Sequence, residues 1–261
     1  MNIPIYQADA FTSERFSGNP AAVCLLDTWL EDPVLQAIAE ENNLSETAFL
    51  VRKGEGFELR WFTPVTEVAL CGHATLASAL VVFDCLDWQL EKITFHTRES
   101  GSLHVTRRNG MLEMNFPTTA SNPTPVPQGL EEALGCELNE TYLAGEDLMI
   151  RLAAEDQVRK LQPRMSRLSE LEHRGFIVTS GGVHCDFVSR FFAPRFGIPE
   201  DPVTGSAHCA LTPFWSRVLN KPNLHARQVS RRGGELFCQD LGDRVRIAGN
   251  AVLYLRGEIT V

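Results

Sequence analysis

Two short segments place glycine and small polar residues at the start of an apolar, helix-like stretch. The first reads C-G-H-A from Cys71, and the second reads G-S-A-H from Gly205. The first turn of a helix presents backbone N–H groups without partners and the positive end of the helix dipole, so such a start can bind an anion. If both starts face one cleft, they can hold a small carboxylate or phosphate from two sides. The alternative is that Gly72 and Gly205 only allow tight entry into each helix.

A carboxylate stands at an unusual place in N-L-S-E-T-A-F, residues 43–49. Glu46 enters a hydrophobic strand directly after a turn. A buried or half-buried glutamate has a raised pKa and can exchange protons near neutral pH. The alternative is an exposed glutamate at the edge of a strand, which is the usual environment of this residue.

Three further side chains could take part in the same chemistry. At a helix start, His73 can donate to a bound anion or relay a proton, or it can be a hydrogen-bonded structural residue. Asp201, in E-D-P-V-T-G-S-A-H, can cap the helix or hold a substrate amine or hydroxyl. Ser206 resembles a nucleophile only superficially, because T-G-S-A-H lacks the second glycine of G-x-S-x-G.

Several catalytic signatures are absent from the sequence. It contains no G-x-x-x-x-G-K-[ST], no strand-linked G-x-G-x-x-G, no H-E-x-x-H and no zinc spacing among cysteine and histidine. We therefore expect no metal and no other cofactor. Proton transfer by side chains alone suits that constraint, whereas hydride and phosphoryl transfer do not.

The composition disfavours some partners. The chain of 261 residues has 24 Lys and Arg against 33 Asp and Glu, a formal net charge of −9, whereas non-specific nucleic-acid binding needs a basic surface. No stretch reaches the roughly 18 apolar residues of a membrane span. The first residues, MNIPIYQADAF, are typical of a strand and not of an export signal. The 7 cysteines form no C-x-x-C pair, which indicates reduced thiols in the cytoplasm.

The elements that would position these groups can be located. Apolar stretches predict buried helices from Gly72 to about Phe83 and from Gly205 to about Leu219. Short strands surround them, and the Asn109-Gly110 dipeptide predicts a hairpin. Residues 117–127 hold four prolines without periodicity, which is typical of a linker.

The two halves of the chain repeat one order of features. A strand, an F-x-P tripeptide, a loop with small residues and a buried helix occur in both halves, with F-x-P at Phe62 and again at Phe192. The second connecting loop is three residues longer than the first. The repeated order predicts a duplicated unit in which a sheet surrounds a central helix.

Six segments combine into a more specific pattern. They are D-A-F-T at 9–12, S-G-N-P-A-A-V at 17–23, N-L-S-E-T-A-F at 43–49, R-W-F-T-P at 60–64, C-G-H-A-T-L-A-S-A at 71–79 and E-D-P-V-T-G-S-A-H at 200–208. Together they resemble the PhzF-like family of the diaminopimelate epimerase superfamily, which is named for the phenazine-biosynthesis isomerase. The resemblance covers nearly the whole chain, and the third, fifth and sixth segments together are specific.

The resemblance implies an α+β, diaminopimelate-epimerase-like fold. Two similar half-domains would each wrap a curved, mostly antiparallel sheet around a central helix, with the site in the cleft between them. We expect the N-terminal half-domain at residues 1–117, joined by the last strand at about 250–261, and the C-terminal half-domain at residues 128–249.

The resemblance also implies an isomerase of a small, carboxylate-bearing metabolite that works as a homodimer. Glu46 would be the general acid/base, with His73 and Asp201 as further catalytic residues. The substrate-binding residues would be Asn19, Ser45, Gly72, Thr204, Gly205 and Ser206. The family's phenazine member shifts a double bond and a proton on a dihydro-hydroxyanthranilate, but family membership supports the reaction type better than the compound.

Two other functions stay open. Cofactor-free amino-acid epimerases use two opposed cysteines, and Cys71 stands where the first of them would. The second segment has no cysteine before its helix, and Cys209 lies one turn inside it. An epimerase or racemase using Cys71, with Glu46 as its second base, is therefore one alternative; Cys71 could also be a small buried residue. The other alternative is a non-catalytic protein that binds a metabolite or a partner.

Overall fold

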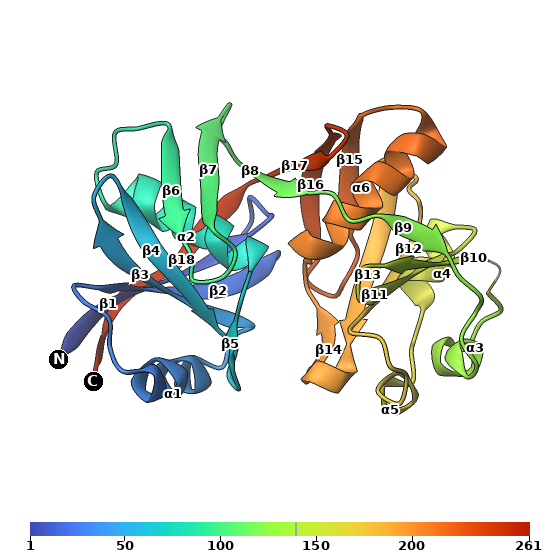
Figure 1. The fold of residues 1–261 in the computed structure, drawn as a ribbon, viewed down its shortest axis with the longest axis horizontal. Coiled ribbons are helices and arrows are strands. Elements are labelled where there is room, and N and C mark those ends of the chain that lie inside the picture. Colours follow the sequence, from blue (N-terminus) through green and yellow to red (C-terminus); the bar gives the residue numbers. More distant parts are fainter. Residues whose placement is uncertain (139) are drawn as a thin grey trace. The chain divides into compact units, whose positions relative to one another are not determined.

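The computed structural model, shown in Figure 1, describes residues 1–138 and 140–261. The chain forms two compact units: the first is Met1–Asn115 with Ile247–Val261, and the second is Phe116–Arg246. Each unit mixes strands and helices, which confirms the predicted α+β class. Among the described residues, no helix has the length and the apolar character that a membrane crossing needs.

The first unit is built mainly of antiparallel strands. Strand β1 pairs with β18 and β2, β2 runs parallel to β3, and β3 pairs with β4. Strand β4 pairs with the short β5 and runs parallel to β6, and the sheet continues through β7 and β8. The bounds of its elements are β1 (Asn2–Ala10), β2 (Asn19–Leu26), α1 (Asp32–Asn42), β3 (Glu46–Lys53), β4 (Gly56–Phe62), β5 (Glu67–Val68), α2 (Gly72–Cys85), β6 (Lys92–His96), β7 (Ser102–Arg108), β8 (Met111–Pro117) and β18 (Ala251–Thr260).

The second unit repeats this pairing. Strand β10 pairs with β9 and β11, β11 runs parallel to β12, and β12 pairs with β13. Strand β13 pairs with the short β14 and runs parallel to β15, which pairs with β16. The bounds of its elements are β9 (Ser121–Pro123), α3 (Leu130–Leu134), β10 (Glu140–Ala144), β11 (Asp147–Arg151), α4 (Glu155–Lys160), α5 (Met165–Leu168), β12 (Phe176–Gly181), β13 (Phe187–Ala193), the 3-10 helix η1 (Pro194–Phe196), β14 (Ile198–Asp201), α6 (Gly205–Leu219), β15 (Asn223–Gln228) and β16 (Gly234–Asp240). Strand β17 (Arg244–Gly249) begins in the second unit and ends in the first.

Each unit thus inserts one long helix at the same step of the pairing pattern. Helix α2 follows β5 and precedes β6, and α6 follows β14 and precedes β15. In the strand register, Thr47 of β3 is opposite Phe62 of β4, just as Phe176 of β12 is opposite Phe192 of β13. The agreement extends to single residues, which supports the proposed duplication.

Helix α2 has an apolar surface all round because it is buried all round. Every residue from His73 to Val82 is buried, and the helix packs against β1, β2, β3 and β18. Its two hydroxyls donate to carbonyls one turn back, Thr75 to Cys71 and Ser78 to Ala74, so burial leaves neither without a partner. The helix extends two residues beyond its predicted end.

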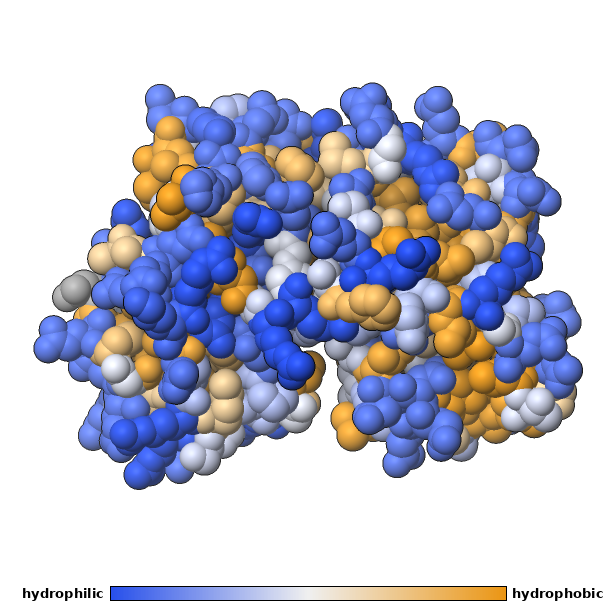
Figure 2. Space-filling view, turned by 180° about the vertical axis from the view of Figure 1, so that it is seen from behind, coloured by the Kyte–Doolittle hydropathy of each residue, from blue (hydrophilic) through white to orange (hydrophobic). Residues whose placement is uncertain are grey.

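Smaller apolar clusters cover the other faces of the sheets. In the first unit, Leu35 and Ile38 of α1 pack with Phe49 of β3 and Phe62 of β4. In the second unit, α3, α4 and α5 pack on β11, β12 and β13 around Phe176. On the face drawn in Figure 2, hydrophilic residues predominate and apolar patches lie between them.

Three local features show how the sequence determines the structure. Asn109 and Gly110 both adopt positive φ, 52° and 81°, and close the β7–β8 hairpin as predicted. Helix α1 has Glu31 as its N-cap and begins at Asp32, with Pro33 in its first turn, where a proline needs no hydrogen-bond partner. The proline-rich stretch 117–127 contains the short strand β9, which pairs with β10, so part of this expected linker belongs to a sheet.

Candidate active site

Glu46 is the first residue of β3, where the chain leaves the turn after α1. Parallel pairing with β2 starts at this residue, opposite Ala21. The side chain of Glu46 is only 12% exposed. The structure therefore places this carboxylate at the entry of an apolar strand, as the sequence pattern predicts.

The side chain of His73 contacts Glu46 from the neighbouring helix. His73 is the second residue of α2, its side chain is 6% exposed, and its Nε2 lies 3.0 Å from Oε2 of Glu46. This is the distance of a close ion pair, although the two groups lack the alignment of a hydrogen bond. A titratable ring and a carboxylate thus meet in a place that is nearly closed to water.

The other ring nitrogen of His73 has two neighbours. The side-chain amide of Asn19 lies 3.2 Å from Nδ1, and the Sγ atom of Cys71 lies 3.5 Å from it. Asn19 is fully buried at the start of β2, and Cys71 is the N-cap residue of α2. These contacts fix the orientation of the ring, so that Nε2 faces Glu46.

Burial and charge act in opposite directions on this cluster. Burial lowers the pKa of His73, but the neighbouring Cys71 and the Glu46 carboxylate outweigh it and raise that pKa well above 6.5. Burial, assisted by the charge of Glu46, raises the pKa of the Cys71 thiol to about 11. At neutral pH Cys71 is therefore a neutral thiol, and the Glu46 carboxylate is the group that favours the protonated form of His73.

The same three side chains contain the donor atoms of a metal site. Glu46, Cys71 and His73 offer oxygen, sulfur and nitrogen atoms within 4.8 Å of one another. A single ion binds one ring nitrogen, however, and here the thiol and the carboxylate approach opposite nitrogens of His73. The arrangement is better described as a chain of proton donors and acceptors.

A second group of polar side chains precedes α6 in the second unit. Asp201 is the last residue of β14, and its carboxylate accepts a hydrogen bond from the hydroxyl of Thr204, the N-cap residue of α6. The side chain of Gln228, on β15, accepts from the backbone N–H of Thr204 at 2.9 Å. The same amide donates to the Asp201 carbonyl at 2.8 Å and to the Thr204 hydroxyl at 3.1 Å.

The N-cap residue of α6 has one more partner inside the helix. The Nδ1 atom of the fully buried His208 donates to the Thr204 carbonyl at 2.8 Å. Burial lowers the pKa of His208 to about 4, so the ring is neutral at pH 7. His208 therefore contributes no charge to the site and serves to hold the loop that carries Asp201.

The remaining predicted residues lie beside these groups. Gly72 and Gly205 are the first residues of α2 and α6, and neither N-cap side chain accepts a hydrogen bond from the first turn. Ser206, the second residue of α6, is exposed, and Ser45 is half-buried in the turn before Glu46. In the first unit the structure thus brings four predicted residues together: Asn19, Glu46, Cys71 and His73.

Sequence reasoning missed Gln228. It is separated by 24 residues from Thr204, the nearer of its two partners, and stands in an ordinary strand pattern. The available signal is a polar residue at a buried strand position, since Gln228 is only 1% exposed and a buried amide requires partners.

Comparisons with known proteins agree with this fold. The model of a family described as phenazine biosynthesis-like protein matches residues 8–257. A Pseudomonas aeruginosa protein named an uncharacterized isomerase is 50% identical, over 99% of each chain. The crystal structure of a PhzF-family protein from Enterococcus faecalis, 46% identical, matches 100% of both chains with a TM-score of 0.97. A hydroxyproline epimerase from Agrobacterium vitis is 10% identical and shares the fold, with a TM-score of 0.61 over 99% of this chain and 92% of its own.

The fold is that of the epimerase-like proteins. Within that class, this chain belongs to the phenazine biosynthesis-like family, as the six sequence segments predict. Two relatives at 50% and 49% identity are named isomerases, which confirms the predicted enzyme class at the level of the family.

Proposed function

We propose that this protein is a cofactor-independent isomerase that moves a proton on a small, carboxylate-bearing metabolite, with Glu46 as the general acid/base. The observation that carries the proposal is the pair of Glu46 and His73, 3.0 Å apart and nearly buried. Nearly buried carboxylates that face an ionisable ring are typical of sites where protons are transferred.

The four clustered side chains of the first unit each have a role in the proposed reaction. The Glu46 carboxylate removes a proton from a substrate carbon, the electron pair left behind shifts the double bond, and the carboxylic acid formed returns the proton at another carbon. The positive charge of His73 stabilises the negative charge that moves between Glu46 and the substrate. Asn19 and Cys71 hold the ring in place from its other side.

The residues before and within α6 complete the proposal. Asp201 would hold a polar group of the substrate, with its orientation set by Thr204 and Gln228. The first-turn N–H groups after Gly72 and Gly205 would bind the substrate carboxylate, together with the exposed hydroxyl of Ser206. That both sets act on one substrate in an interdomain cleft, with Ser45 nearby, is part of the proposal.

The experiment follows solvent deuterium into candidate substrates. Pure protein is incubated in deuterium oxide with cyclic and amino-acid carboxylates, including dihydro-hydroxyanthranilate, and mass spectrometry records a gain of one deuteron. We expect gain with the wild type and loss of at least about a hundredfold in Glu46→Gln, the size of a general acid/base contribution.

A matched control separates chemistry from folding. Glu41→Gln makes the same change on the exposed end of α1, close to Glu46 in sequence, and should leave the rate unchanged. Exchange that persists in Glu46→Gln would place the base elsewhere. Stabilisation by a compound without any exchange would favour the alternative, a metabolite-binding protein without catalysis.

Cys71 supports a second candidate, a cysteine-assisted epimerase or racemase. The observation in its favour is the contact of the Cys71 thiol with His73, 3.5 Å away. Against it, burial raises the pKa of Cys71 to about 11 and that of Cys209 to about 12, so neither is a ready thiolate at neutral pH. Product chirality and thiol alkylation distinguish the two candidates.

Assembly and compartment belong to the proposal as well. A homodimer follows from the family resemblance, and light scattering of the purified chain would measure it. The seven cysteines are all free, which supports a reducing compartment such as the cytoplasm. Retention of activity in a reducing buffer, with loss after oxidation, would agree with that environment.

A further inference from the structure

The segment that leads into each central helix carries the same ion pair. In the first unit R-W-F-T-P begins at Arg60, and in the second R-F-F-A-P begins at Arg190. The acidic partners are Glu67 and Glu200, and each lies five residues before the glycine that opens its helix. The three extra residues of the second loop therefore lie before Glu200, so that its spacing to the helix is unchanged.

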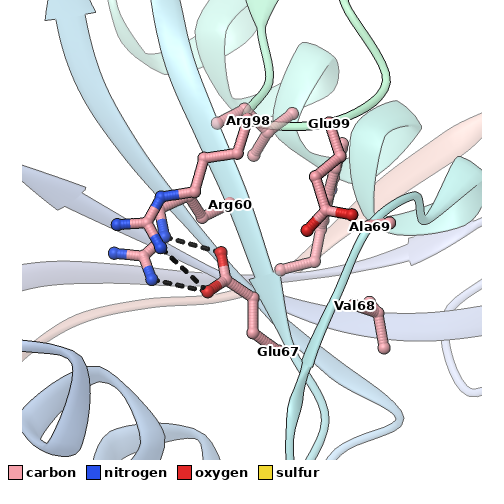
Figure 3. Close-up of a pocket in the computed structure, with 8 residues that line it drawn as sticks. Arg60, Glu67, Val68, Ala69, Arg98 and Glu99 are labelled. Carbon is pink, nitrogen blue, oxygen red and sulfur yellow. Dashed lines mark hydrogen bonds and ion pairs between the residues drawn. The ribbon is translucent and has the colours of Figure 1, made fainter.

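The first pair joins β4 to β5. The Nε and Nη2 atoms of Arg60 donate to the two carboxylate oxygens of Glu67, at 2.7 and 2.6 Å. Figure 3 shows the Glu67 carboxylate directed at the guanidinium groups of both Arg60 and Arg98. Asp32 at the start of α1 accepts from Nη1 of Arg60 at 2.9 Å. Since the Arg60 side chain is only 3% exposed, its charge depends on these carboxylates.

The second pair joins β13 to β14 in the same way. The Nε and Nη2 atoms of Arg190 donate to the two oxygens of Glu200, at 2.6 and 3.0 Å. The third nitrogen, Nη1, donates to the carbonyls of Val158 and Leu161 at the end of α4. Both guanidinium groups also stack on the phenylalanine of their own F-x-P tripeptide, each 4.9 Å from the ring centre.

Such pairs are geometrically strict. A guanidinium that meets a carboxylate through two parallel hydrogen bonds fixes distance and angle together, which a single contact does not. The short strands β5 and β14 add little order of their own, since β5 has 2 residues and β14 has 4. The paired arginine therefore attaches each short strand to the long strand beside it.

We propose that Arg60–Glu67 and Arg190–Glu200 are duplicated clamps that position the reacting groups of the site, the first setting His73 against Glu46 and the second setting Asp201. The inference rests on the proposed function for the roles of Glu46, His73 and Asp201. The clamp residues touch no substrate in this proposal and act only as positioning residues.

The path from the first clamp to the acid/base pair is short. Glu67 lies opposite Phe62 in the β4–β5 register, and Phe62 lies opposite Thr47, the neighbour of Glu46. Four residues after Glu67 comes Cys71, and His73 follows on the first turn of α2. The clamp thus ties the strand next to Glu46 to the segment that delivers His73.

The path from the second clamp is shorter still. Asp201 directly follows Glu200 and lies opposite Phe191, the neighbour of Arg190. Thr204, three residues further on, bonds to the Asp201 carboxylate. A displaced Glu200 would move Asp201 with it, and displacement of a positioned group by about 1 Å can cost a hundredfold in rate.

The test uses the full chain with Glu67→Gln or Glu200→Gln, which keep the side-chain shape and weaken the pairing. Lys53→Gln is the control in the first unit. It breaks the pair of Lys53 with Glu58 from its exposed end and leaves the bond of Glu58 to Trp29 intact. Glu140→Gln is the control in the second unit, since it breaks a cross-strand pair with an arginine, in a hairpin that leads to no central helix.

Two readouts are taken on each variant. The first is kcat and KM for deuteron incorporation into dihydro-hydroxyanthranilate. The second needs no substrate: the ring nitrogen resonances of His73 report its contact with Glu46, and those of His208 report its bond to the Thr204 carbonyl. We expect each clamp variant to shift only the histidine of its own unit. We also expect kcat to fall about ten- to a hundredfold with KM changed less than about threefold, and both controls to match the wild type.

The outcomes separate the clamps from the proposed function. Resonances that stay in place in both variants would overturn the inference, and so would shifted resonances with kcat within threefold of the wild type. If the wild type does not act on dihydro-hydroxyanthranilate, another carboxylate of the panel that exchanges replaces it. If none exchanges, the proposed function fails, and the resonances alone decide whether the clamps position these groups. If a glutamine variant does not fold, Glu67→Asp and Glu200→Asp keep the charge and shorten its reach, and should give smaller shifts of the same histidines.

Discussion

The side chain of Gln228 is expected to hold the loop before α6 together. It makes three hydrogen bonds: it accepts from the Thr204 N–H and donates to the Asp201 carbonyl and the Thr204 hydroxyl. Gln228 is 1% exposed, so these bonds are screened from water. Gln228→Ala removes all three bonds and leaves the backbone groups of Thr204 and Asp201 without this partner.

The expected loss follows from the burial of those groups. Each buried backbone group that loses its partner costs about 1–3 kcal/mol. Thr204 is buried, whereas Asp201 is half-buried and its carbonyl can gain a water molecule. We therefore expect Gln228→Ala to lower the free energy of unfolding by about 2–4 kcal/mol. This is near the lower end of the cost of two buried backbone groups without partners, with the lost side-chain packing added.

Urea unfolding of three variants measures this effect. Gln228→Glu keeps an acceptor for the Thr204 N–H, but it buries a carboxylate that faces the Asp201 carbonyl. At pH 7 its loss of stability should therefore be at least as large as that of Gln228→Ala. Gln239→Ala, the same truncation at a half-buried position of β16, should change stability by less than about 0.5 kcal/mol. A Gln228→Ala protein within that same margin of the wild type would refute the reasoning.

Two further predictions concern buried titratable groups. Burial lowers the pKa of His208 from 6.5 to about 4, so between these pH values the unfolded chain binds a proton at His208 and the folded chain does not. The free energy of unfolding should therefore be constant in this respect above pH 6.5. It should fall by about 3 kcal/mol as the pH drops toward 4, at about 1.4 kcal/mol per pH unit. Between pH 7 and pH 4 the urea midpoint of His208→Gln should fall less steeply than that of the wild type, and equal slopes for the two proteins would contradict this prediction. For Cys71, whose pKa is raised to about 11, Cys71→Ser and treatment with iodoacetamide should each leave deuteron transfer within about threefold of the wild type; a loss above tenfold would instead favour the cysteine-assisted epimerase.

Local sequence patterns were sufficient for the elements that carry the site. The apolar run after Gly72 has no polar face, so it predicts a buried helix without knowledge of its neighbours. The run after Gly205 also predicts a helix, but Ser206 and the last turn from Arg217 to Leu219 are exposed, so α6 is not buried all round. Glu46 was identified because a carboxylate is rare at the entry of an apolar strand. Each of these predictions uses only residues within one element.

Other elements depend on partners that are distant in sequence. Strand β2 was not predicted, since Pro20 near its start argues against a strand. The structure tolerates Pro20 because parallel pairing with β3 begins only at Ala21. The ion pairs of Arg60 with Glu67 and of Arg190 with Glu200 were also missed. Each pair forms only because two antiparallel strands bring the residues together, and the sequence alone does not show that pairing.

The register allows the two units to be compared residue by residue. Since Phe62 corresponds to Phe192, Glu46 corresponds to Gly175, the residue before the start of β12. A Cβ atom at Gly175 would lie 2.3 Å from the Phe191 ring, so this position cannot accept even alanine without a shift. The second unit therefore has no room for a counterpart of Glu46.

The other members of the cluster are replaced as well. Counted from the clamp glutamates, Cys71 corresponds to Thr204 and His73 to Ser206. The three titratable groups of this cluster thus correspond to a glycine and two hydroxyl-bearing residues in the second unit, whose own carboxylate, Asp201, stands at a different position. A two-base racemase needs proton donors and acceptors on opposite sides of one carbon, whereas an isomerase can use one carboxyl group for removal and return. The unequal chemistry of the two units thus favours the proposed single-base isomerase over a two-base racemase.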